Sequence, residues 1–191
     1  MIEVFDTAAA RQALTRGLLR CPDCAQPLRP WGQARERTVR NLGGAVVTAR
    51  PDRARCTGCR ATHVVLDAGL LPRRAYTVQV VGKALLAAAR GHGHRRIAAQ
   101  LHAPHGTVRG WIRRARRSAH RLWTIGVRAV VTLEPAALPT ADRPDSLTSA
   151  VEVLAAAATA LSHRFGLHAT HPWARIVVLT RGRLLAPLPT G

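Results

Sequence analysis

The sequence predicts an α+β fold, in which a small β-ribbon precedes a set of helices. Two observations predict it. Four cysteines in two C-x-x-C pairs lie among short segments of strand-like alternation, and from about residue 78 the apolar residues repeat at helical spacing. We expect an N-terminal helix at 1–19, a ribbon at 20–70, a three-helix unit at 75–125, a linker at 132–145 and a helical C-terminal segment at 146–191.

The N-terminal stretch, MIEVFDTAAARQALTRGLLR, predicts no export. It carries acids where a signal peptide has basic residues, and it lacks an uninterrupted apolar core. The longest apolar candidate elsewhere, at 150–161, is too short to span a bilayer and contains Glu152. We therefore expect a cytoplasmic protein without membrane contact.

The cysteine pairs predict a metal site. Cys21 and Cys24 form one pair, and Cys56 and Cys59 form the other. Two C-x-x-C loops can complete a closed tetrahedral site of four thiolates, so we expect one structural Zn²⁺ with no position open for catalysis. Two disulfides are the alternative, and reducing conditions inside a cell disfavour them.

The residues between the pairs predict a β-hairpin. ERTVRNL and AVVTARP flank Gly43 and Gly44, which can adopt the positive φ of a tight turn, and THVVLD (62–67) follows the second pair as a third strand. This is the plan of a zinc ribbon, in which the metal stabilises a unit with too small a core to fold alone.

The segment from 75 to 125 predicts three short helices. The first has apolar residues from Val78 to Ala88 on one face and stops at Gly91, and the second starts near His94 and buries Ile97, Ala98 and Leu101. The third runs to about Leu122. It buries Val108, Trp111, Ile112 and Ala115. Three short helices with glycine-containing turns and a basic last helix indicate a helix-turn-helix.

Charge points to the partner. The net charge is +19, and residues 68–133 hold twelve Arg and Lys83 without one acid. Such a field favours a polyanion, and phosphate backbones bind basic surfaces through counterion release. A membrane surface is the competing polyanion, but the segment lacks the large apolar face of an interfacial helix. We expect double-stranded DNA as the partner, and hence a nucleoid-associated protein.

RRIAAQLHAPHGTVRGWIRR resembles the second and third helices of homeodomain-like domains in bacterial recombinases and transposases. A zinc ribbon followed by a helix-turn-helix is similar to the N-terminal DNA-binding part of insertion-sequence transposases. The whole chain, including PWARIVVLTRGRLLAP, looks like an actinobacterial family of such proteins without assigned function. The turn departs from the pattern, because Ala103 and Pro104 stand where Ser or Thr usually caps the helix.

The apolar stripe of the third helix determines which residues face outward. Arg109 and Arg113 are the candidates for contact with base edges, where arginine recognises guanine, and two glycines, Gly106 and Gly110, lie beside them. For any single arginine, surface solvation is the alternative. The other candidate DNA contacts, to phosphate or near the helix start, are Arg95, Arg96, His105, Thr107, Arg114, Arg116 and Arg117.

The histidines of the same segment offer a second possible metal site. His92, His94, His102 and His105 could ligate zinc, but no Cys or carboxylate lies near them and the surrounding charge would repel a dication. We expect them to be incidental to the turns.

The C-terminal segment contains a heptad seam. Asp145 or Ser146 can cap a helix whose apolar positions run from Leu147 to Phe165 in steps of four and three. The seam could form a homodimer through 147–165, or it could pack within the chain on WARIVVLTRGRLL.

The acids do not suit an enzyme. A three-carboxylate transposase needs acids gathered around two metal ions, and Glu134, Asp142, Asp145 and Glu152 lie in a linker and a helix start. We expect a non-enzymatic DNA-binding protein without a small-molecule substrate, either a transcriptional regulator or a transposase-derived module. The alternative is an accessory protein that binds DNA non-specifically and recruits a separate catalytic partner. RNA binding is disfavoured because the chain has few aromatics for stacking.

Overall fold

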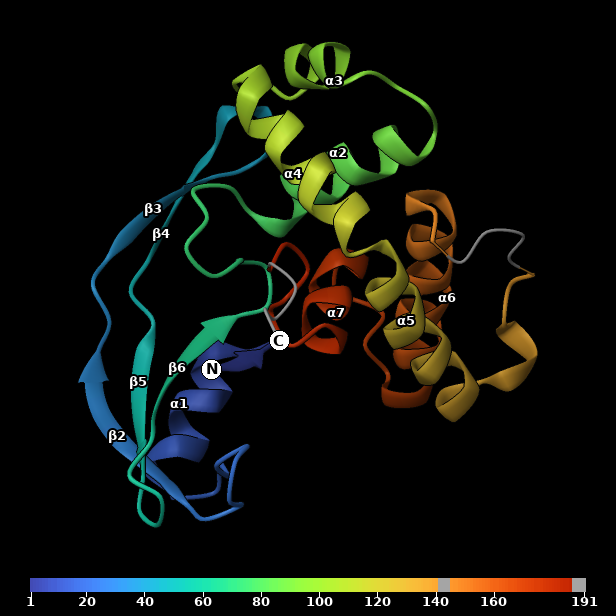
Figure 1. Ribbon diagram of the computed structural model, residues 1–191. Helices are drawn as coiled ribbons and strands as arrows, with labels where there is room; N and C mark the ends of the chain where they lie inside the picture. The colour runs from blue at the N-terminus through green and yellow to red at the C-terminus, as the bar shows by residue number, and fades with distance from the viewer. Residues whose placement is uncertain (141–144, 187–191) are drawn as a thin grey trace.

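The computed structural model describes residues 1–140 and 145–186, and it confirms the mixed α+β class (Figure 1). Residues 141–144 of the predicted linker and 187–191 of the predicted C-terminal segment lie outside the described residues. The elements in chain order are β1 (Ile2–Val4), α1 (Thr7–Thr15), β2 (Leu28–Gln33), β3 (Arg37–Arg40), the 3₁₀ turn η1 (Leu42–Gly44), β4 (Val46–Ala49), β5 (Asp52–Cys56), β6 (Thr62–Asp67), α2 (Val78–Ala89), α3 (His94–Gln100), α4 (His105–Arg117), α5 (Ala119–Leu133), the 3₁₀ turn η2 (Pro135–Ala137), α6 (Leu147–Phe165) and α7 (Pro172–Leu179).

A four-stranded sheet in the order β1-β6-β5-β2 forms the N-terminal part. β5 pairs antiparallel with both β6 and β2, whereas β1 pairs parallel with β6. Helix α1 covers one face of this sheet, where Ala10 and Leu14 pack with Leu28, Ala54 and buried neighbours in a small cluster. Among the residues that the structure describes, no helix lies on the other face (Figure 1).

The predicted hairpin forms a two-stranded arm of β3 and β4, separate from this sheet. Gly43 and Gly44 at its turn have φ of 67° and 79°, as a tight turn requires. The turn end of the arm is held to the segment just before α2, where the amide of Arg40 donates to Ala75 and the amide of Thr77 donates to Arg40.

Residues 1–19 are not one helix, which corrects the first predicted boundary. They begin with β1, whose Ile2 pairs with Val65, and only then form α1, capped by Asp6 through hydrogen bonds from the amides of Ala8 and Ala9. Pairing with a strand about sixty residues away stabilises an extended Ile-Glu-Val segment that has no local partner.

The first two helices predicted for the segment 75–125 are confirmed as α2 and α3, and the third is shorter than predicted. It ends at Arg117 as α4, and after Ser118 a new helix, α5, continues to Leu133. The boundary expected at residue 125 therefore lies inside α5, and the first residues of the expected linker are helical.

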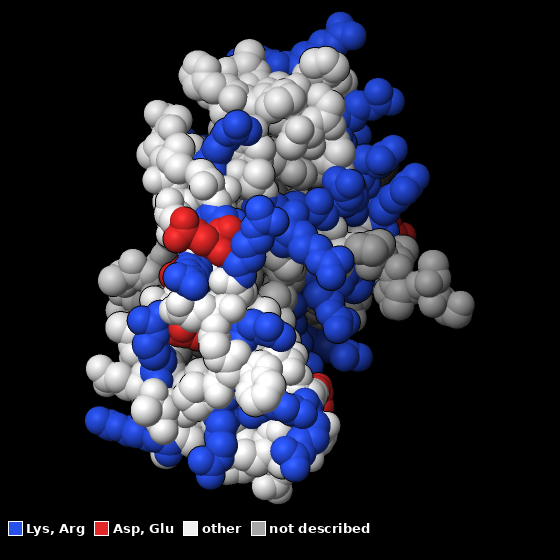
Figure 2. All heavy atoms as spheres, turned by 90° about the vertical axis from the view of Figure 1, so that its left-hand side faces the viewer, with Lys and Arg blue, Asp and Glu red and all other residues white. Residues whose placement is uncertain are grey.

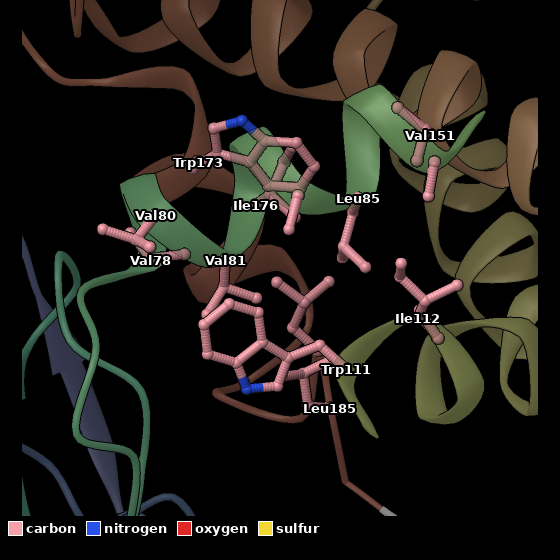
Figure 3. Packing of buried hydrophobic residues seen from close by; sticks show 14 of the residues in the cluster. Val78, Val80, Val81, Leu85, Trp111, Ile112, Val151, Trp173, Ile176 and Leu185 are labelled. Atoms are coloured by element: carbon pink, nitrogen blue, oxygen red, sulfur yellow. The ribbon is translucent and has the colours of Figure 1, made fainter. Parts of the chain in front are cut away.

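The helices share one large core, in which α2 is central (Figure 3). Trp111 of α4 and Trp173 of α7 lie on opposite sides of α2, and Val151 of α6 packs beside Leu85 (Figure 3). The core thus joins the predicted three-helix unit to the C-terminal segment, although the sequence analysis expected that segment to begin as a separate part at residue 146.

The heptad seam of α6 packs within the chain. Leu147, Val151, Leu154 and Ala158 are buried with residues of α2 and α7, while Leu161 is half-buried and Phe165 is exposed. Ser146 caps the helix by accepting from the amide of Ser149. The intrachain alternative accounts for the buried part of the seam.

Within residues 1–140 and 145–186, we find no helix that combines the length and apolar character needed to cross a membrane.

Candidate metal centre and nucleic-acid interface

Strands β2 and β5 bring the two cysteine loops together. Leu28 of β2 pairs with Cys56 of β5, so the loop before β2 and the loop after β5 meet at one end of the sheet. The amide and the hydroxyl of Thr57 both donate to the carbonyl oxygen of Pro27, which ties one loop to the other.

The two loops are built alike. The residue after each C-x-x-C pair, Ala25 in one loop and Arg60 in the other, has a positive φ, of 59° and 63°. This left-handed conformation is uncommon for residues with a Cβ, and its repetition at equivalent positions indicates that each loop is shaped to turn its two sulfurs toward one point.

All four predicted ligands lie together. Every pair of their sulfur atoms is within 4.8 Å, with 3.7 Å between Cys21 and Cys59 and 3.4 Å between Cys24 and Cys56. None is in a disulfide, and Cys21 and Cys56 are buried. Four sulfur donors at these separations could hold a metal ion.

The close sulfurs perturb one another. Hydrogen bonds from the amide of Gln26 and the thiol of Cys56 lower the pKa of Cys24 to about 6. The amide of Ala61 lowers the pKa of Cys59, but hydrogen bonding with the thiols of Cys24, Cys56 and Cys21 outweighs it and raises that pKa to about 12. One thiol therefore ionises readily while another resists, as expected of like charges gathered in one place.

His63, which the sequence analysis missed, is a neighbour of the cysteine cluster. It is buried on β6, with its Nε2 3.4 Å from the sulfur of Cys21 and 3.8 Å from a carboxylate oxygen of Asp23. Burial lowers its pKa. A neutral imidazole can donate its Nε2 proton to a thiolate, which would orient and stabilise that ligand. The available signal was its place at an inward position of the strand after the second loop.

The four histidines of residues 92–105 do not form a comparable group. The rings of His94 and His105 are 6.4 Å apart between centroids, and none of the four belongs to a set of three or more close ligands in the described chain. The structure thus brings together the cysteines and not these histidines.

The predicted contact residues of α3 and α4 lie on the outer side of these helices. Arg95, Arg96, His105 and Gly106 are exposed, as are Arg109, Arg113, Arg116 and Arg117, while Thr107, Gly110 and Arg114 are half-buried. The core side of α4 consists of Val108, Trp111, Ile112 and Ala115, as predicted.

The arginines of this face have no carboxylate partner among the described residues, since no ion pair there involves α3 or α4. Arg74, which the sequence analysis did not single out, is a further cation near Arg114, since burial and the nearby charge of Arg114 both lower its pKa. Figure 2 shows Lys and Arg gathered along one margin and across the middle of the molecule, with Asp and Glu only in small groups.

The two glycines of α4 are not needed for packing within the chain. A Cβ at Gly106 would meet nothing within 4 Å, and one at Gly110 would meet only the flexible end of Arg114, at 3.2 Å. Their side of α4 is open.

The turn before α4 is short. Four residues separate α3 from α4, and His102 among them has a φ of 49°. Pro104 occupies the N-cap without a side-chain hydrogen bond, one position before the first helical residue.

These features define a class of protein: a mixed α+β protein that carries a four-cysteine candidate metal centre at one end of its sheet and a set of helices with a basic outer side. Its family follows from the sequence match. The chain belongs to the family described as a domain of unknown function, DUF6431, which matches residues 21–118. The matched stretch begins at the first cysteine and ends one residue after α4. No match was found among curated proteins, and none among solved structures.

Proposed function

We propose that the protein binds double-stranded DNA through α4, as a transcriptional regulator or a transposase-derived DNA-binding module without a catalytic domain. The observation that carries the proposal is the outer side of α4, where exposed arginines without carboxylate partners among the described residues flank exposed Gly106 and half-buried Gly110. Arginines on one side of a helix suit both base edges and phosphates.

In this proposal α2, α3 and α4 form a helix-turn-helix with α4 as the recognition helix. Support comes from the four-residue turn between α3 and α4 and from the packing of Trp111 and Val108 against α2. The face of α4 opposite this packing would enter the major groove.

We further propose that the cysteines hold one structural Zn²⁺. A Zn–S bond of about 2.3 Å in a tetrahedron places sulfurs about 3.8 Å apart, close to the observed 3.4 and 3.7 Å. Four thiolates fill the coordination sphere, so the ion would stabilise the ribbon and orient it beside the helices, and no position is left for a reacting water.

The test is a band-shift selection from random DNA duplexes. Enrichment of a discrete motif is the expected result. Salt-dependent binding without a motif would instead support an accessory protein that contacts DNA non-specifically.

Arg113→Ala should weaken binding to the selected motif by about 1–3 kcal/mol, or roughly 5- to 150-fold in Kd, and relax specificity at one base position. Arg117→Ala should weaken all duplexes alike and reduce the salt slope by about 1. Arg128→Ala on α5 is the matched control, because it removes an equal exposed charge from another helix. Equal weakening of all duplexes by Arg113→Ala would exclude a base contact.

Gly110→Ala should stabilise the protein and weaken DNA binding. Alanine raises helix stability by up to about 1 kcal/mol, while its methyl group would hold the helix backbone away from the groove floor. Thermal unfolding and duplex titration measure the two effects separately. A more stable variant with unchanged affinity would show that the glycine has no role at the interface.

A further inference from the structure

The face of the sheet away from α1 is basic. Strand alternation directs Leu28, Ala54 and Cys56 into the cluster under α1, so Arg29, Arg53 and Arg55 point to the opposite face. In the register of β2 and β5, Arg29 lies directly opposite Arg55.

This arrangement opposes folding when nothing is bound. Like charges directly across a strand pair are destabilising, and none of the three arginines makes an ion pair with a carboxylate in the described residues. The nearest strand acid by register, Asp52, is already engaged by Arg11, with 2.8 Å between nitrogen and oxygen. Three unneutralised guanidinium groups on one open face fit an anionic partner.

An exposed aromatic ring lies on the same face. Trp31 is 49% exposed, and the guanidinium of Arg55 stands 4.5 Å from the centroid of its ring. The ladder is irregular between Pro30 and Gln33, and Gly32 there has a φ of 75°. A bulge of this kind re-aims a side chain, and here it presents the indole beside the arginines.

We propose that this sheet face binds an unpaired DNA strand, with a base stacked on Trp31 and phosphates paired with Arg29, Arg53 and Arg55. An accessible indole among cations is the combination that binds single strands, since any base offers a π-face and the backbone supplies the charge. Duplex DNA fits less well because its bases are already stacked on one another. The site is separate from α4 and does not depend on the proposed duplex binding.

The experiment measures fluorescence anisotropy of labelled oligodeoxythymidine, about fifteen nucleotides long, with zinc-loaded full-length protein. Trp31→Ala should weaken binding roughly 5- to 150-fold, the range expected for loss of one base stack. Trp31→Phe should retain most of the affinity. Because Trp31 is largely outside the core, neither substitution should change the unfolding temperature.

Phe165→Ala is the matched control. Phe165 is 61% exposed and also has a guanidinium nearby, that of Arg164 at 6.0 Å, but it lies on α6 away from the sheet. Its substitution should leave the affinity for the oligonucleotide unchanged. Equal effects of Trp31→Ala and Phe165→Ala would overturn the proposal.

Other probes separate this site from the alternatives. Tighter binding of oligouridine RNA than of oligodeoxythymidine would overturn the assignment to DNA. Displacement of the strand by polyglutamate at equal charge would show a general anion site without stacking, and would also overturn it. On a duplex, Arg113→Ala should weaken binding and Trp31→Ala should not. If only the duplex measurement fails, the proposed single-strand site on the sheet is unaffected, because its evidence is independent of α4.

Discussion

Replacing Cys56 with serine is expected to abolish metal retention and to unfold the sheet. Cys56 is buried, and it lies in a cluster of only seven buried residues, two of which are cysteines of the candidate metal site. So small a core cannot offset the loss of a structural zinc, which contributes roughly 10–16 kcal/mol in isolated zinc fingers. The large helical core does not contain these residues, so α2–α7 should keep most of their helicity.

Metal analysis and thermal unfolding by circular dichroism provide the measurements. The parent protein should contain about one zinc per chain, and Cys56→Ser should contain almost none. Thr57→Ser is the matched control, because it changes the neighbouring residue and keeps the hydroxyl that donates to Pro27. Unchanged zinc content in Cys56→Ser would contradict the site, and two ions per parent chain would revive the histidine site.

The sequence predicted those strands and helices whose pattern lies within the segment itself. Alternation and turn glycines predicted β6 and the β3–β4 arm, and helical spacing predicted the bounds of α2 and α3. The C-x-x-C spacing predicted all four clustered sulfurs, because two residues of spacing confine each pair to one loop.

The missed elements depend on distant contacts. β1 is a three-residue strand that exists through its pairing with β6. β2 and β5 have the sequences LRPWGQ and DRARC, in which arginine, proline and glycine hide the alternation of a half-buried strand. The break between α4 and α5 falls at Ser118, a buried residue with neither glycine nor proline beside it, so no stop signal was present.

The candidate binding residues were also hidden from the sequence where they depend on distant contacts. The small number of aromatic residues argued against base stacking, yet the fold exposes Trp31 beside Arg55. The position of one aromatic residue therefore matters more here than the number of aromatic residues in the chain. His63 and Arg74 likewise gain their significance from neighbours that are distant in sequence, Cys21 and Arg114.

The second large effect is expected where α7 crosses α2. Trp173 is buried against Gly82, and a Cβ at Gly82 would overlap its indole ring. Trp173→Ala should destabilise the protein by about 3–5 kcal/mol through the cavity it leaves. Gly82→Ala should cost about 1–3 kcal/mol through overpacking, partly offset by about 1 kcal/mol of helix propensity.

The double variant gives the sharper result, because the contact predicts a change of sign. Once the indole is gone, the methyl group added by Gly82→Ala no longer overlaps a ring. The gain in helix propensity then remains, and the substitution should stabilise the protein by up to about 1 kcal/mol. Gly110→Ala, on an open helix face, should stabilise both backgrounds equally. Denaturant unfolding measures all four proteins. If Gly82→Ala has the same effect with and without Trp173, the contact is not energetically significant. If Trp173→Ala leaves the unfolding of α2–α4 unchanged, the C-terminal helices form a separate unit, as the boundary at residue 146 implied.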